Sequence, residues 1–317
     1  MKLFKQILSM LLVLLVFASF NLSLYLMYTS RCANNFSDAK GMKVIEPEKY
    51  LPFDEDSLIV KADSTFKLTE DLPVLDGAAA LLPVYSAIAN AVYPADSCFF
   101  DGESYTSESA VQFTNTVRAY KGVVDGTCDL ILCAAPSKEQ LKYAEDKGVE
   151  LVFVPVGYEA FVFIVNENNP VNDLTSEQIR GIYSGEYVSW SQLGGANRFI
   201  NPLDRIEGSG SQTVMLNFMG DKQIKKSPLA FMGATIGFSF RYYVEGIVGN
   251  ADVKMISVDG VYPDKENIRN GSYPLVYNFY AVYRADNKNE NVKALVDWIL
   301  SEEGQYIIDQ SGYVALN

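Results

Sequence analysis

Apolar and polar positions along the chain predict an N-terminal membrane segment followed by an α/β protein. The first long apolar run extends from Ile7 to Tyr28 and follows Lys2 and Lys5. As a helix with a rise of about 1.5 Å per residue, this run reaches roughly 30 Å, which is enough to cross a bilayer. Lysines before such a span favour a cytoplasmic N-terminus. We therefore expect a cell-membrane protein with one N-terminal helix and an extracellular folded domain.

Two other fates of this segment stay open. Val16–Ala18 has marginal small-residue spacing for signal-peptide cleavage, which would give a secreted protein. Cys32 suggests a lipid anchor, although Arg31 stands where a small residue is expected before a lipidated cysteine. We expect an uncleaved anchor over residues 1–32 first, a removed signal second and a lipidated cysteine third.

Residues 33–67 are mixed and polar, so we expect a tether with one short strand at Ser57–Lys61. Beyond the tether, short apolar runs alternate with helical patterns. The expected strands lie within 72–77, 128–133, 151–156, 159–165, 199–206, 236–244, 254–258 and 277–283. The expected helices lie within 83–93, 117–124, 138–146, 175–183, 213–219, 264–270, 291–300 and 302–310. This alternation predicts mostly parallel sheets flanked by helices.

Composition narrows the functional classes. The net charge of −13 argues against a nucleic-acid partner. The absence of histidine excludes Ser-His-Asp and Cys-His nucleophile systems and His-ligated zinc. Carboxylate or metal chemistry through aspartate and glutamate stays formally possible on these grounds. The four cysteines form no CxxC pair; Cys128 and Cys133 suit buried thiols, and a Cys98–Cys128 disulfide is an open alternative outside the cell.

The clearest candidate chemistry lies in the stretch from Asp204 to Gln212. It joins an extended apolar run to a helix, and Ser209 and Ser211 are both suitable N-cap residues. A helix N-terminus presents unpaired N–H groups and partial positive charge, and Gly210 lets a ligand approach them. Arg205 adds a cation that can grip an oxyanion through two hydrogen bonds. The stretch predicts a cradle for a tetrahedral oxyanion; an ordinary Gly/Ser turn with a surface arginine is the alternative.

Two further loops lie at the starts of helices. One follows the first strand and contains Ala78–Leu81, and the other contains Thr116, which is expected to N-cap the next helix. In α/β folds, ligands bind at the carboxyl ends of strands, where helices begin. The common location of the three loops favours the oxyanion interpretation.

Six motifs in this order resemble the PstS-like phosphate-binding proteins of ABC uptake systems, a group of type-2 periplasmic binding proteins. The motifs are Asp76-Gly77-Ala78-Ala79-Ala80-Leu81-Leu82-Pro83, Asp125-Gly126-Thr127-Cys128-Asp129-Leu130, Tyr183-Ser184-Gly185 with Trp190, Arg205-Ile206-Glu207-Gly208-Ser209-Gly210-Ser211-Gln212, Asn270-Gly271-Ser272-Tyr273-Pro274-Leu275 and Glu302-Glu303-Gly304-Gln305. The resemblance implies two α/β lobes, 68–160 plus 275–317 and 161–274, that close over a ligand. It also implies binding of phosphate or a related inorganic anion without chemistry, and ABC permease subunits as partners.

The resemblance also implies which residues hold the anion. They are Arg205, Ser209, Gly210 and Ser211 from lobe two, and the amides near Ala80 and Leu81 from lobe one, with Thr116 as a weaker match.

This chain departs from the family pattern in two places. Ala78–Ala80 stand where serine or threonine is usual, and Ala134 stands where many phosphate binders have an aspartate that accepts the ligand's proton. Such a carboxylate repels a fully deprotonated anion, so its loss should weaken selection of phosphate over sulfate. These departures leave a second function open, a membrane-anchored sensory or interaction domain of the same fold with weak or no phosphate binding.

Overall fold

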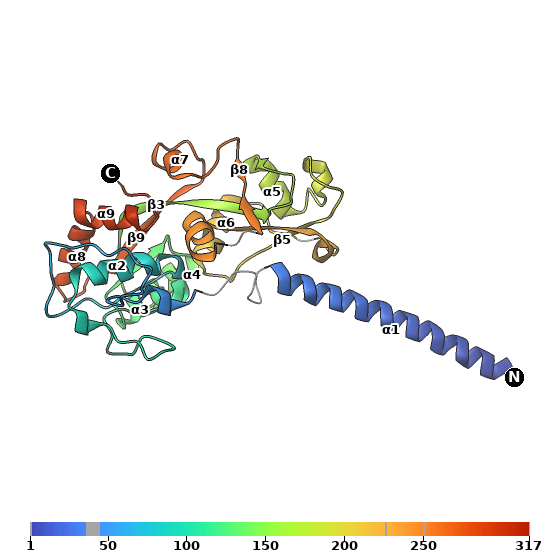
Figure 1. Ribbon diagram of the computed structural model, residues 1–317, viewed down its shortest axis with the longest axis horizontal. Coiled ribbons are helices and arrows are strands. Elements are labelled where there is room, and N and C mark those ends of the chain that lie inside the picture. Colours follow the sequence, from blue (N-terminus) through green and yellow to red (C-terminus); the bar gives the residue numbers. More distant parts are fainter. Residues whose placement is uncertain (1, 36–44, 226, 250–251, 317) are drawn as a thin grey trace.

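The computed structural model describes residues 2–35, 45–225, 227–249 and 252–316. At the N-terminus, α1 (Lys2–Asn35) projects from the folded part as a separate rod (Figure 1). Its segment Phe4–Tyr25 is long and apolar enough to cross a membrane, and none of the side chains in that window is buried. The helix expected over Ile7 to Tyr28 is confirmed, and both an anchor and a signal sequence have this form.

Across the described residues, the strands form a seven-stranded sheet and a separate two-stranded sheet. The order in the large sheet is β1-β2-β9-β3-β6-β5, with β7 also paired to β3, and the small sheet pairs β4 with β8. The strands are β1 (Leu75–Gly77), β2 (Leu130–Ala134), β3 (Leu151–Asn166), β4 (Asp173–Leu174), β5 (Ile200–Pro202), β6 (Ala234–Phe240), β7 (Val253–Met255), β8 (Ser257–Val258) and β9 (Val276–Arg284).

The large sheet is mixed, so the expectation of mostly parallel sheets is wrong within a correct α/β class. The β1–β2 and β5–β6 pairs are parallel. The pairs at the centre, β2–β9, β9–β3 and β3–β6, are antiparallel. The reason is topological: the chain leaves along β3 and returns along β9, which inserts between β2 and β3 in the opposite direction.

β3 is one continuous strand where the sequence predicts two. Its first part pairs with β9 as far as Ala160, which lies opposite Val276. Its second part pairs with β6, beginning with Phe161 opposite Phe240. The register of the β3–β9 pairing shifts between Pro155 and Gly157, the residues that suggested a break. A β-bulge at this point leaves one position unpaired without ending the strand pairing.

Helices cover both faces of the β1-β2-β9-β3 part and pack on the β6 part as well (Figure 1). They are α2 (Leu82–Val92), α3 (Asn115–Asp125), α4 (Lys138–Asp146), α5 (Ser176–Ser184), α6 (Gly210–Met219), α7 (Lys265–Arg269), α8 (Asn291–Ile299) and α9 (Glu302–Gln310). α2, α8 and α9 share one hydrophobic cluster, and α3 and α4 share another. α5, α6 and α7 contribute to a third cluster, formed mainly between Ala160 and Leu275.

We propose the two lobes with the expected boundaries, 68–160 plus 275–317 and 161–274. The buried residues of the third cluster run from Ala160 to Leu275, with Val314 as the one later member. The other two clusters take their buried residues from both sides of that interval, apart from Tyr243 in the first. The chain therefore passes between separate cores at Ala160 and again near Leu275.

The expected tether is part of the folded body from Ile45 onward. Ile45, Tyr50 and Ile59 are buried in the core cluster of lobe one, and Pro47–Tyr50 forms a short 3₁₀ helix. Ser57–Lys61, all of it described, forms no strand. The three apolar side chains are widely spaced in a polar segment, so they give no periodic signal, although each removes apolar surface from water. The earlier part of the expected tether, 36–44, lies outside the described residues.

The cysteines of the folded part are free thiols. Cys98, Cys128 and Cys133 each carry an unoxidised sulfur, so the alternative of a Cys98–Cys128 disulfide is not met in the structure. The Cys128 thiol is buried and donates to the Ala119 carbonyl at 3.9 Å. Burial raises the pKa of the Cys98 thiol to about 11, which disfavours the reactive thiolate.

Candidate functional site

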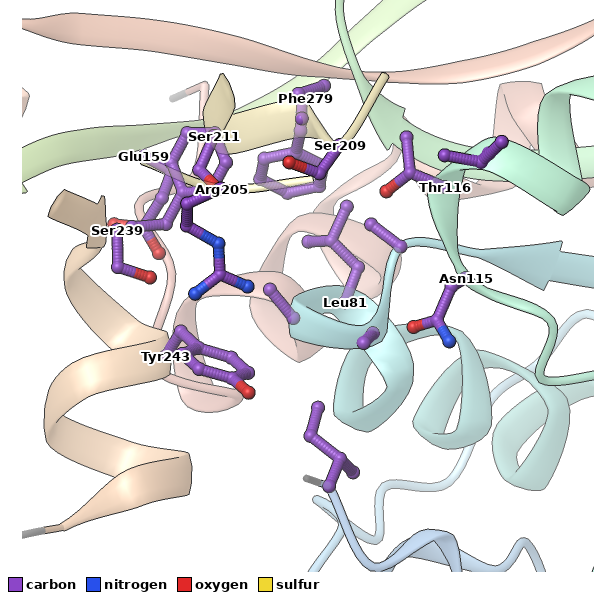
Figure 2. A pocket seen from close by; sticks show the side chains of 18 of the residues that line it. Leu81, Asn115, Thr116, Glu159, Arg205, Ser209, Ser211, Ser239, Tyr243 and Phe279 are labelled. Carbon is purple, nitrogen blue, oxygen red and sulfur yellow. The ribbon is translucent and has the colours of Figure 1, made fainter. Parts of the chain in front are cut away.

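The candidate site is a cavity of about 300 Å³ between the two proposed lobes (Figure 2). The sequence-predicted residues that line it are Ala80, Leu81, Thr116, Arg205, Ser209, Gly210 and Ser211. Segments as far apart in the chain as Ile45, Ala134 and Tyr313 complete the wall. The structure thus brings together all the residues that the resemblance carried over.

The start of α6 forms one side of the cavity. Ser209 is the N-cap, and its hydroxyl oxygen accepts a hydrogen bond from the Gln212 amide at 3.3 Å. The Gln212 side chain in turn accepts the Arg205 amide at 2.8 Å, which fixes the loop against its own helix. Figure 2 shows the Arg205 guanidinium projecting toward the space between Tyr243 and Leu81. A cation and a helix N-terminus therefore converge on one space, an arrangement that attracts anions.

The two proposed lobes touch at one edge of this cavity. The Gln140 side chain, from the capping box that starts α4, donates to the Gly208 carbonyl at 3.1 Å. Gly208 has a φ of +77°, a conformation that favours glycine. A Cβ atom on Gly210 would lie 3.2 Å from the Cβ of Ala134. Glycine at 210 therefore allows α6 to approach the end of β2 closely.

The lobe-one side of the cavity offers fewer donors than the sequence suggested. Ala79–Leu81 form a 3₁₀ turn in which the Leu81 amide donates to the Ala78 carbonyl at 2.8 Å. The Ala78 amide donates to Leu132 at 2.9 Å. The expected Leu81 amide is therefore engaged within its own loop.

Thr116 lines the cavity, but it is not the N-cap of α3. That position belongs to Thr114, whose hydroxyl donates to the Asp76 carboxylate at 2.5 Å and whose amide donates to it at 2.9 Å. Thr116 lies in the first helical turn and is buried. The prediction of a Thr116 cap is wrong because Asp76 holds Thr114, two residues earlier. Burial raises the pKa of Asp76, and the Thr114 bonds oppose that rise.

Six polar lining residues were missed by the sequence reasoning, namely Asn115, Glu159, Ser239, Tyr243, Asn278 and Tyr313. Four of them, Glu159, Ser239, Tyr243 and Asn278, come from β3, β6, the π-helix Tyr243–Val248 that follows β6, and β9. No local motif joins them, since only the sheet pairing brings them together. A usable signal was the lone acid at the head of the apolar run that begins at Ala160, because a charged residue inside a buried strand needs a partner.

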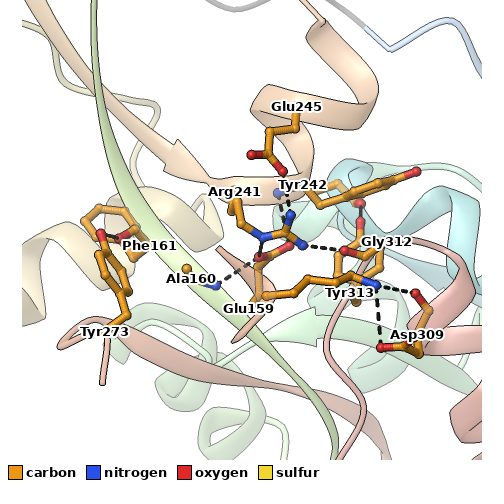
Figure 3. A network of polar contacts seen from close by, with 12 residues as sticks. Glu159, Ala160, Phe161, Arg241, Tyr242, Glu245, Tyr273, Asp309, Gly312 and Tyr313 are labelled. Atoms are coloured by element: carbon orange, nitrogen blue, oxygen red, sulfur yellow. Dashed lines mark hydrogen bonds and ion pairs between the residues drawn. The ribbon is translucent and has the colours of Figure 1, made fainter. Parts of the chain in front are cut away.

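That partner is Arg241, directly after β6. Glu159 and Arg241 are 4% and 5% exposed, and their charged groups lie 3.6 Å apart. The Glu159 carboxylate also accepts the amides of Ala160 at 2.9 Å and Tyr242 at 3.3 Å. Arg241 donates to Glu245 at 2.5 Å and to the Gly312 carbonyl (Figure 3). This junction network, Glu159–Arg241–Glu245–Gly312, joins the strand shared by both lobes to the C-terminal segment.

Burial raises the pKa of Glu159 to about 7, against the opposing pull of Arg241. The folded chain therefore binds more protons at this site than the unfolded chain between about pH 4.5 and 7. Its stabilising contribution is full below the unfolded pKa and is lost as the pH rises through the folded one.

Replacement of Glu159 by glutamine should remove this pH dependence. Between pH 5 and pH 8, the free energy of unfolding of Glu159→Gln should rise relative to the wild type by about 2–3 kcal/mol. Denaturant titrations of both proteins at the two pH values measure the difference. A difference that stays constant across this range would contradict the raised pKa.

The donors at the cavity suit an anion. Among the described residues, no group of three histidine, cysteine, aspartate or glutamate side chains is placed to hold a metal ion. Arg205, the hydroxyls of Ser209 and Ser211 and the N-terminus of α6 instead provide positive charge and hydrogen-bond donors at the same place.

Comparison with known families assigns the fold. Residues 73–303 match the model of a PBP superfamily domain. The chain belongs to the PBP superfamily. The match begins just before β1 and ends within α9, so it covers most of both proposed lobes and most of the residues that line the cavity.

Individual members of the PBP superfamily resemble this chain at moderate identity. The phosphate-binding protein PstS of Borreliella burgdorferi is 26% identical over 58% of this chain and 72% of its own length. A substrate-binding protein assigned to a phosphate ABC transporter of Clostridium perfringens, solved with bound phosphate, is 25% identical with a TM-score of 0.57, covering 79% of this chain and 100% of its own. An ABC-type phosphate transport receptor from Vibrio cholerae shares the fold at 19% identity and a TM-score of 0.53, covering 78% and 99%. The resemblance to PstS-like proteins is confirmed.

Proposed function

We propose that this chain is an extracytoplasmic solute-binding protein that captures phosphate or a similar small oxyanion in the cavity between its lobes. The observation that carries the proposal is the convergence of Arg205, Ser209, Gly210 and Ser211 on one cavity at the start of α6. PstS-like relatives that are named for phosphate binding support phosphate as the first ligand to test. The function is binding without chemical conversion.

Isothermal titration calorimetry of the full-length chain in detergent micelles tests this function. Phosphate and sulfate are titrated separately at pH 5 to 8. Saturable binding of either anion supports a solute receptor. No heat with either anion in this range would contradict the proposal.

Introducing a carboxylate at position 134 should restore discrimination between the anions. Ala134 is the last residue of β2 and lies against Gly210, at the N-terminus of α6, where the ligand would bind. In Ala134→Asp, a fully deprotonated sulfate meets an acceptor that it cannot satisfy, so its affinity should fall at least tenfold more than that of phosphate. Calorimetry measures both constants.

Ala134→Asn is the matched control, since it has nearly the same shape without the charge. The phosphate-to-sulfate preference of Ala134→Asn should stay close to that of the wild type. If asparagine and aspartate change the preference equally, the effect is steric and the charge argument is wrong.

We further propose that α1 stays attached as a membrane anchor, with the folded domain outside the cell and ABC permease subunits as partners for uptake. Lys2 and Lys5 before the apolar span Phe4–Tyr25 support this orientation. Mass spectrometry of the mature N-terminus tests it. A chain that retains residues 2–28 supports the anchor, whereas a chain that starts after Ala18, or at a lipidated Cys32, would replace it with a removed signal or a lipid anchor.

A second function is favoured by the small number of hydrogen-bond donors that Ala78–Leu81 present to the cavity. Ala78–Ala80 carry no hydroxyl, and the Leu81 amide is engaged within its turn. A chain that binds neither anion but keeps the fold would act as a membrane-anchored sensory or interaction domain. Co-purification with a phosphate-transporter permease would count against that role.

A further inference from the structure

The cavity is larger than a tetrahedral oxyanion requires. Its volume is about 300 Å³, within the size range of cavities that hold small organic molecules. One water molecule takes roughly 30 Å³ in the liquid, and a bare oxyanion is only a few times larger. A bare oxyanion on Arg205 would therefore leave much of the cavity unfilled.

The two sides of the cavity differ in chemistry. Arg205, Ser209 and Ser211 place a cation and two hydroxyls on the lobe-two side. On the lobe-one side, Ala78–Ala80, Leu81 and Phe113 form an apolar surface that is flanked by the polar side chains of Asn115 and Thr116. Figure 2 shows the Leu81 side chain across the open space from the Arg205 guanidinium. A ligand that is polar at one end and apolar at the other would match these two surfaces.

Two backbone amides and one carbonyl of the apolar side are already engaged. The amides of Ala78 and Leu81 donate within the protein, to Leu132 and to Ala78. The Ala80 carbonyl accepts the hydroxyl of Tyr313. An oxyanion oxygen placed here would lose water without gaining these donors, which is unfavourable. An alkyl group placed here gives up no hydrogen bonds to water, and its contact with the apolar side chains removes apolar surface from water.

One acceptor in the wall points to a proton on the ligand. The Asn278 Oδ1 atom is buried and accepts no hydrogen bond in the structure, and its residue lines the same cavity. A singly protonated head group would supply the missing donor. Sulfate, which carries no proton at neutral pH, would leave the oxygen unsatisfied.

We propose that the cavity binds a singly substituted tetrahedral oxyanion in its singly protonated form, a phosphonate or phosphate monoester with a short apolar substituent. Its head group lies on Arg205 and the start of α6, and its substituent lies against Leu81 and Phe113. This inference rests on the oxyanion site of the proposed function and names the class of ligand that fills it.

A homologous series tests the proposal by calorimetry on the full-length chain in detergent micelles. The probes are inorganic phosphate and methyl-, ethyl- and propylphosphonate, with propyl phosphate to distinguish an ester from a phosphonate. Each added methylene that is fully buried should tighten binding about fourfold. Propylphosphonate should therefore bind about 15-fold more tightly than methylphosphonate.

Two variants report on the apolar side. In Leu81→Ala, the ratio of propylphosphonate to phosphate affinity should fall about tenfold, because the substituent loses its contact. Ala79→Ser adds only one hydroxyl to the same side and should also lower this affinity ratio. It therefore tests the same point where Leu81→Ala folds poorly. Leu141→Ala, at an exposed position on α4 outside the cavity, should leave the ratio unchanged.

The possible results separate the two proposals. A constant or falling affinity along the series, with inorganic phosphate bound tightly, would overturn the substituted ligand and leave the proposed function intact. Binding of no probe at all would overturn both. A rising series that is insensitive to Leu81→Ala and Ala79→Ser would also overturn the assignment, because the substituent would then lie elsewhere.

Discussion

Replacement of Arg205 by alanine is expected to weaken oxyanion binding by about 10²–10⁴-fold. Its side chain projects into the cavity beside Ser209 and Ser211, where it can donate two hydrogen bonds to one anion. Hydrogen bonds to charged groups contribute about 1.5–3 kcal/mol each, and two of them account for this range. Calorimetry with phosphate on Arg205→Ala and wild-type protein measures the loss.

Two companion variants sharpen the test. Arg205→Lys keeps the charge and loses the paired geometry, so its affinity should lie between those of the wild type and the alanine variant. Arg198→Ala removes an exposed arginine from the same lobe, outside the cavity, and should bind like the wild type. Wild-type affinity in Arg205→Ala would show that the arginine has only a structural role.

Replacement of Arg241 by methionine is expected to lower the free energy of unfolding by about 3–5 kcal/mol at pH 8. The change leaves the Glu159 carboxylate buried without the cation that lies 3.6 Å away. It also removes the donors to Glu245 and Gly312 in the junction network. At pH 5 the loss should be smaller, because a carboxyl group whose pKa is about 7 is then largely protonated. Denaturant titration at both pH values measures it.

The matched control for this variant is an exposed ion pair. The Arg269 side chain is 52% exposed and lies 2.9 Å from Asp309, so Arg269→Met should cost less than about 1 kcal/mol. The double variant Glu159→Gln/Arg241→Met should recover part of the stability, since no charge is then left buried. Equal losses in Arg241→Met and Arg269→Met would contradict the importance of burial.

Local signals in the sequence predicted much of the fold. Capping boxes at Ser137 and Thr175 start α4 and α5, and α4 and α9 have the predicted bounds. These features depend on side chains three or four residues apart, which a single sequence displays. The continuity of β3 was missed because Pro155 and Gly157 usually end strands, and a bulge between them is stabilised only by the partner strand β9.

The candidate site was predictable in part, for the same physical reason. Arg205 and Ser209–Ser211 form one contiguous motif at a helix start, so their meeting at a cavity followed from the chain. Glu159 and Arg241 are 82 residues apart and meet only through the β3–β6 pairing. The residues next to Glu159 and Arg241 in the sequence give no indication of this long-range pairing.

The position of Ile45 in the cavity wall limits how far the binding site can lie from the membrane. Ile45 follows Asn35, the last residue of α1, by ten residues. A fully extended chain covers at most about 3.3–3.6 Å per residue, so this wall lies within roughly 36 Å of the end of α1. With α1 as the proposed membrane anchor, the cavity stays within a limited distance of the lipid surface. An encounter with the proposed permease partner would then be a search in two dimensions, in which a short tether raises the effective concentration and a weak contact is sufficient.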